Sequence, residues 1–120
     1  MTEYIQFLLL ILFMHWVTDF VFQSDAMALQ KSENNWVLGK HCLVYSLPIA
    51  FPFLIFGLLK ALVVFVVFFL THFSIDYVTA RLNKKFWLNN KRHEFFVMIG
   101  FDQFLHIGII LLLSSLLWRG

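Results

Sequence analysis

Long apolar runs separated by short polar segments dominate the chain. The longest runs lie near residues 5–24, 36–58, 60–82 and 95–118. Because about 20 apolar residues are needed to cross a bilayer as a helix, each run predicts one membrane-crossing helix. We therefore expect an all-α fold, a four-helix transmembrane bundle in which residues 1–120 form a single integral membrane domain.

Two of the polar segments carry further structural signals. SDAMALQKSENN, after the first span, predicts a short interfacial helix that Ser24 or Asp25 can cap, with Met27 and Leu29 facing lipid. NKKFWLNNKRHE, after the third span, reads as a basic, polar loop. The connection between the second and third spans is only a tight turn near residues 57–60.

Composition supports the membrane assignment, and charge gives it an orientation. With 61% hydrophobic and 13% charged residues the chain is not an ordinary soluble globule, and a net charge of +2 is too small to indicate nucleic-acid binding. Lysine and arginine are concentrated around the first and third connections, whereas the opposite side carries Lys60 and Arg119. The positive-inside rule then predicts that both termini face away from the cytosol.

Histidine and aspartate recur at a spacing of four inside the apolar runs. His15 and Asp19 lie in the first span and His72 and Asp76 in the third, while the fourth span holds the inverted pair Asp102 and His106. Residues four apart share one helix face. Each of these spans therefore presents one imidazole and one carboxylate in a single direction.

Depth along the spans indicates that these pairs meet. At about 1.5 Å per residue, the three aspartates and His41 fall roughly 8–10 Å below the cytosolic helix ends. The other three histidines fall roughly 13–17 Å deep. The inverted order in the fourth span is what an antiparallel helix requires. The sequence thus predicts two polar layers in one half of the bundle.

A divalent metal is the natural partner for such a set. Each aspartate near a span centre opposes insertion by about 2.5–3.5 kcal/mol, and a structural-type metal site returns about 10 kcal/mol or more. Cys42 is the only cysteine, so the ligands must be imidazole and carboxylate, which suit zinc best and also iron or manganese. One or two ions can be held by the seven candidates His15, Asp19, His41, His72, Asp76, Asp102 and His106.

Within that set several arrangements stay open. His15, His72 and His106 can hold one tetrahedral zinc with an open water position. The aspartates then orient these histidines, bind a second ion or act as general base. The alternative without metal is a hydrogen-bonded His/Asp core that joins the helices.

Four other side chains are candidates for the site. Tyr45, four residues after His41, can donate a proton or a hydrogen bond to the deeper layer. Gln23 continues the stripe of the first span and can bind substrate, and Asp25 and Lys31 can flank the mouth of the site.

The motifs HWVTDFVFQSDAMALQK, WVLGKH, THFSIDYVTARL and DQFLH resemble the domain-of-unknown-function 3307 family of small bacterial and phage membrane proteins, over nearly the whole chain. The resemblance covers the ligand candidates and adds Gln103 to the substrate-binding candidates. It implies the membrane fold and a location in the bacterial inner (cytoplasmic) membrane, but no reaction.

The leading functional hypothesis is a metal-dependent hydrolase that acts on a lipid or lipid-linked substrate from the cytosolic leaflet, with Asp19, Asp76, Asp102 and Tyr45 as catalytic candidates. The alternative is a metal-ion or proton translocator, which requires a homo-oligomer because four helices are few for alternating access. Apolar residues on the far side, among them Leu9, Val66, Phe68 and Leu111, instead suggest a sealed floor. A third reading is a structural or regulatory membrane protein.

Overall fold

The computed structural model describes residues 2–119, apart from the side chain of Arg119, and within that range it contains only helices and their connections. The elements are α1 (Thr2–Trp16), the π-helical turn η1 (Val17–Val21), α2 (Asp25–Gln30), α3 (Asn35–Ala50), the 3-10 turn η2 (Phe51–Phe56), α4 (Leu58–Leu88) and α5 (Arg92–Arg119). Four segments are long and apolar enough to cross a membrane: Thr2–Val21, Asn35–Phe56, Leu58–Leu88 and Arg92–Trp118. The predicted all-α class with a short helix after the first span is confirmed.

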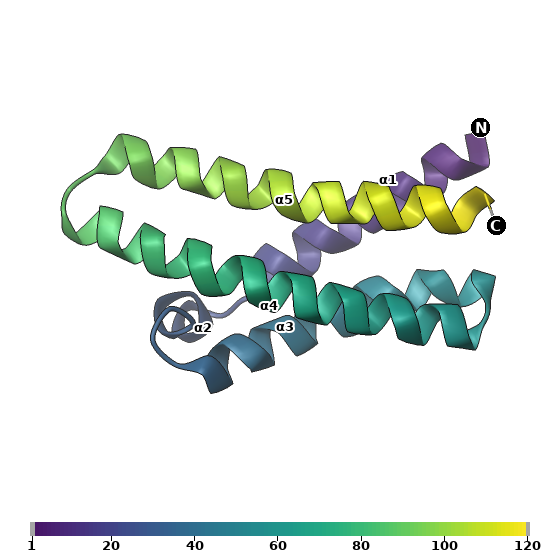
Figure 1. Cartoon of the computed structure of the whole chain (residues 1–120), viewed down its shortest axis with the longest axis horizontal. Coiled ribbons are helices and arrows are strands. Elements are labelled where there is room, and N and C mark those ends of the chain that lie inside the picture. Colours follow the sequence, from purple (N-terminus) through teal and green to yellow (C-terminus); the bar gives the residue numbers. More distant parts are fainter. Residues whose placement is uncertain (1, 120) are drawn as a thin grey trace.

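The long helices run up and down in chain order, as Figure 1 shows, with both termini at one end of the molecule and α2 toward the other. The whole measures 47 × 27 × 20 Å. Helix α4 packs against both α3 and α5, and α1 contacts α3 and α5. This arrangement brings the three His/Asp pairs and His41 to the same part of the bundle.

The segment predicted as a third loop is mostly helical. Helix α4 continues to Leu88 and α5 begins at Arg92, so only residues 89–91 connect them. The polar composition of residues 83–94 does not prevent most of them from forming a helix. Asn90, at φ 58°, ends the run, and the Arg92 guanidinium lies 3.5 Å above the Trp87 ring across the turn. The α4–α5 hairpin therefore projects beyond the other connections.

The other connections largely follow their sequence signals. The Ser24 hydroxyl accepts the Met27 N–H at 3.2 Å and caps α2. Leu29 is exposed as predicted, but Met27 is buried, because this face of α2 packs against α3 rather than facing outward. At the far end the helix geometry of α3 changes to 3-10 after Pro48, and Gly57, at φ 109°, makes the turn into α4.

The interior contains a cluster of polar side chains and an apolar core, whereas the surface is rich in exposed leucine, valine and phenylalanine. The buried polar residues are His15, Thr18, Asp19, His41, Ser46, His72, Asp76, Thr79, His106 and Ser114. The apolar core is built around Phe7, Ile11, Phe53, Phe68 and Ile110. Of the predicted floor residues Phe68 lies in this core, while Leu9, Val66 and Leu111 face outward.

Candidate metal centre

Asp19 lies in a π-helical turn, which the helical spacing of the sequence does not predict. The Phe22 N–H donates to the Val17 carbonyl at 2.8 Å, a bond that spans five residues instead of four. The Thr18 hydroxyl donates to the Met14 carbonyl at 2.8 Å, and such back-bonding competes with the helix ladder and bends it. Single π-turns inside α-helices occur frequently at functional sites. Asp19 is buried at the centre of this turn.

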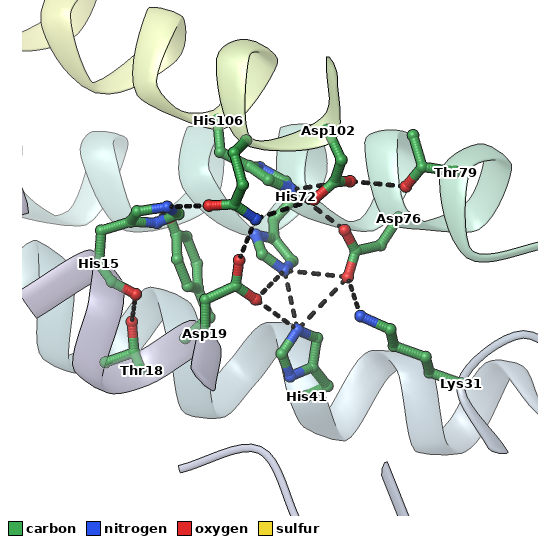
Figure 2. A network of polar contacts seen from close by, with 12 residues as sticks. His15, Thr18, Asp19, Lys31, His41, His72, Asp76, Thr79, Asp102 and His106 are labelled. Carbon is green, nitrogen blue, oxygen red and sulfur yellow. Dashed lines mark hydrogen bonds and ion pairs between the residues drawn. The ribbon is translucent and has the colours of Figure 1, made fainter. Parts of the chain in front are cut away.

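Four ligand atoms from three helical segments converge at one point (Figure 2). His41 Nε2 lies 3.1 Å from Asp19 Oδ1, 3.3 Å from Asp76 Oδ2 and 3.0 Å from His72 Nε2. His72 Nε2 lies 3.5 Å from Asp19 Oδ1 and 3.3 Å from Asp76 Oδ2. Five of the six separations among these atoms are thus 3.0–3.5 Å, close to the edge of about 3.3 Å in a tetrahedron whose corners lie about 2.0 Å from a central zinc. These residues can hold a metal ion.

Hydrogen bonds from neutral imidazoles satisfy only some of these contacts. A neutral imidazole carries one N–H, yet His41 Nε2 faces two carboxylate oxygens and another ring nitrogen at hydrogen-bond distance. A single proton can be directed at only one of them. A cation at the centre could contact all four atoms at once, so these atoms can serve as the ligand set of an ion.

Both carboxylates also reach away from this tetrahedron. Asp76 Oδ1 lies 3.0 Å from His106 Nε2, and Asp19 Oδ2 accepts from the Gln103 amide at 3.3 Å. His106 Nε2 lies 3.4 Å from Asp102 Oδ1. Ligand atoms of Asp19, Asp102 and His106 come within 4.8 Å of one another and form a second group that can hold an ion. Asp19 belongs to both groups.

Lys31, a predicted substrate-binding residue, lies beside the first group. Its ammonium is 3.0 Å from Asp76 Oδ2, and its side chain is 17% exposed. Burial by itself lowers the pKa of Lys31, but the carboxylates of Asp76 and Asp19 outweigh it and raise that pKa above its ordinary value. Lys31 is therefore a permanent positive charge at the edge of the cluster.

His15 joins neither group of converging ligand atoms. Its Nε2 donates to Gln103 Oε1 at 2.8 Å, and its Nδ1 accepts from the Tyr45 hydroxyl at 3.0 Å. The Tyr45 ring also stacks on His72, with centroids 4.0 Å apart. The structure thus places His41, rather than His15, with His72 and the carboxylates, and it gives His15 and Tyr45 the geometry of supports for Gln103.

A cavity of about 660 Å³ opens directly beside the second group. Its polar end includes Asp19, Asp102 and Gln103, and Gln23 and Lys31 also line it, whereas Asp25 is exposed outside it. Its remaining wall is mainly apolar and contains Phe20, Ala28, Leu29, Ala80, Trp87, Leu88, Phe95 and Ile99. The volume and lining are typical of small-molecule sites.

Two residues of the site, Thr79 and Asn83, were missed in the sequence. The Thr79 hydroxyl donates to Asp102 Oδ1 at 2.6 Å, and Asn83 lines the cavity. Both continue the stripe that begins with His72 and Asp76, at the next helical spacings along α4. That continuation was the signal that could have identified them.

Residues 7–119 match the family described as "Protein of unknown function (DUF3307)". No curated protein and no solved structure matches the chain. The match spans almost the whole sequence and includes every residue of the two ligand groups. The chain belongs to the DUF3307 family.

Proposed function

We propose that this protein is a metal-dependent hydrolase of the bacterial inner membrane, which takes a lipid or lipid-linked substrate from the cytosolic side. One observation supports it above the others: a buried His/Asp set with four converging ligand atoms lies next to a cavity whose wall is largely apolar. Zinc is the ion that best fits two imidazoles and two carboxylates in this geometry.

The surface and the charges support the membrane location. Four helices have the length and hydropathy to cross a bilayer, and their outward faces are apolar. Seven lysines and arginines lie near the connections at the α2 end: Lys31, Lys40, Arg81, Lys84, Lys85, Lys91 and Arg92. On the positive-inside rule this end faces the cytosol and both termini face away from it.

The cavity supports an amphiphilic substrate. Leu29, Trp87 and Leu88 can pack against an alkyl chain, while Lys31 can attract an anionic group. Gln23 and Asn83 also line the cavity, and their side-chain amides can hydrogen-bond to a polar headgroup.

The chemistry follows from what lines the cavity. A divalent ion with an open coordination position at the cavity would supply Lewis acidity and lower the pKa of a bound water toward neutrality. Asp19 and Asp102 line the cavity and could accept a proton there, whereas His41, His72 and Asp76 do not line it and would hold an ion behind it. Phe53, Phe68 and Ile110 close the bundle on the far side of the cluster with an apolar core, which supports a one-sided pocket over a permeation path.

The test is a lipid-hydrolysis assay in nanodiscs. Purified protein loaded with zinc is incubated with phospholipids and isoprenoid-linked phosphates, and the products are read by mass spectrometry. We expect hydrolysis of at least one lipid class, loss of at least about 100-fold activity in His41→Ala, and little change in His93→Ala, which removes an exposed histidine. Zinc-loaded wild type that hydrolyses none of these lipids or water-soluble phosphoesters would overturn the hydrolase assignment.

A further inference from the structure

The amide of Gln103 lies between two carboxylates that come from different helices. Its Nε2 donates to Asp102 Oδ2 at 3.1 Å and to Asp19 Oδ2 at 3.3 Å. Two carboxylates brought this close repel each other unless a positive group lies between them. In this structure the partial positive charge of an amide NH₂ is in that position, which makes it a weak substitute for a cation.

The rest of the surroundings are those of a metal ligand set. His106 Nε2 lies 3.4 Å from Asp102 Oδ1, and the ligand atoms of Asp19, Asp102 and His106 are mutually within 4.8 Å. Thr79 donates to Asp102 Oδ1 at 2.6 Å and so orients that carboxylate. A hydrogen bond from a neighbouring side chain to a ligating carboxylate is typical of metal sites.

Asp19 and Asp76 connect this group to the tetrahedral one. Asp19 directs Oδ1 to His41 and Oδ2 toward Gln103, and Asp76 directs Oδ2 to His41 and Oδ1 to His106. Carboxylates that face two ligand groups with different oxygens are what a two-metal site uses to hold its ions about 3.5–4 Å apart.

We propose that the centre is binuclear, with a buried ion held by Asp19, His41, His72 and Asp76 and a second ion held by Asp19, Asp102 and His106 at the cavity. For the first ion this inference rests on the proposed function, and for the second ion it does not. The second ion displaces the Gln103 amide, and it is the one that substrate meets, because Asp19 and Asp102 line the cavity and His41, His72 and Asp76 do not. Four ligands close the first site, whereas three leave an open position at the second.

The orientation of the Gln103 amide controls whether the second ion can bind. Its Oε1 accepts from His15 Nε2, whose ring is oriented in turn by Tyr45. Rotation of the amide turns Oε1 toward the ion and the NH₂ toward His15. His15 Nε2 then accepts a hydrogen bond from that NH₂, which requires its proton to be on Nδ1 instead. The Tyr45 hydroxyl can accept from Nδ1 as well as donate to it, so it fits both tautomers. The His15 and Tyr45 pair thus positions Gln103 in both states.

The experiment counts the zinc ions bound by detergent-purified protein. The protein is titrated with zinc, the bound zinc is measured by elemental mass spectrometry, and its affinity is measured by competition with a chromophoric chelator. We expect two equivalents in wild type, one in Asp102→Asn, and two in Asp25→Asn, which makes the same change at an exposed acid outside the cavity. With manganese, wild type should give the electron paramagnetic resonance signal of a coupled ion pair and Asp102→Asn that of an isolated ion.

A second variant keeps the test decisive if Asp102→Asn does not fold. Gln103→Glu replaces the amide with a third carboxylate, so it should bind the second ion at least about 10-fold more tightly than wild type. Saturation of wild type at one ion, with no tighter binding in Gln103→Glu, would overturn the binuclear centre and leave the first site standing. Absence of any bound ion would overturn both proposals, whereas two ions without hydrolysis would support this inference and remove only the hydrolase.

Discussion

The Nε2 atoms of His41 and His72 lie 3.0 Å apart, and both face the same two carboxylate oxygens. The two histidines are 31 residues apart and come from neighbouring antiparallel helices, α3 and α4. Helix packing alone therefore arranges the ligands, so little further ordering is required when an ion binds. A preorganised ligand set binds its ion more tightly for that reason.

Metal removal should destabilise the protein. An ion present at about 100 times its dissociation constant stabilises the folded state by about 2.7 kcal/mol, which corresponds to a melting temperature lower by roughly 10 °C after treatment with a chelator. Circular dichroism of the detergent-solubilised protein measures this. The chelator should lower the melting temperature of the His41→Ala/His72→Ala variant less than that of wild type, because this variant keeps only the ligands of the second group. An unchanged melting temperature in wild type would contradict the metal centre.

Replacing Lys31 should destabilise the metal-free form more than the metal-loaded form. Lys31→Met keeps the apolar stem and removes the ammonium that lies 3.0 Å from Asp76 Oδ2. The metal-free form should lose about 1.5–3 kcal/mol, the contribution of a charged hydrogen bond. Zinc should bind at least about threefold more tightly, because a neighbouring positive charge is gone. Equal destabilisation of both forms in thermal melts would show that Lys31 acts independently of the ion.

Tyr45→Phe should act on stability more than on metal binding. It removes the hydroxyl that donates to His15 Nδ1 at 3.0 Å and keeps the ring that stacks on His72. We expect a loss of about 1 kcal/mol in the free energy of unfolding and an unchanged zinc content. Once a substrate is identified, a fall in kcat of about 100-fold or more would instead identify Tyr45 as a direct proton donor.

Filling the cavity should block the substrate and leave the metal in place. Ala80 lines the cavity on α4, so Ala80→Phe introduces a ring into the space predicted for the lipid. We expect kcat/KM to fall at least about 10-fold through lost binding while zinc stoichiometry stays as in wild type. Ala26→Phe makes the same change at an exposed position outside the cavity and is the control. Equal activity of the two variants would place the substrate elsewhere.

The turn before α4 should depend on glycine. Gly57 has φ 109° and ψ 156°, a conformation almost confined to glycine, so Gly57→Ala should cost about 1–3 kcal/mol. Gly39→Ala is the matched control: an added Cβ at this helical position meets no atom within 4 Å, and alanine there should stabilise by about 0.5–1 kcal/mol. Opposite shifts in melting temperature are expected, and a shift in the same direction would contradict this account.

Much of the architecture could be read from the sequence because hydropathy and helix period act locally. The four apolar runs marked the long helices, and Ser24 marked the cap of α2. The spacing of His72 and Asp76, and of Asp102 and His106, placed each pair on one face. Local polarity was a poor guide at residues 83–94, because a polar segment that follows an apolar helix can remain helical.

Which histidines face the carboxylates was decided only by the tertiary structure. Spacing along a helix does not specify the rotation of that helix about its axis relative to its neighbours, and this rotation directs His15 to Tyr45 and Gln103 instead of to the ion site. The π-turn at Asp19 likewise adds a local shift that no 3.6-residue period predicts. The sequence by itself determined the long helices and the polar residue types that they carry. Only the packing of α3, α4 and α5 around η1 decided which atoms meet, because ligand geometry depends on angles between helices that no single segment encodes.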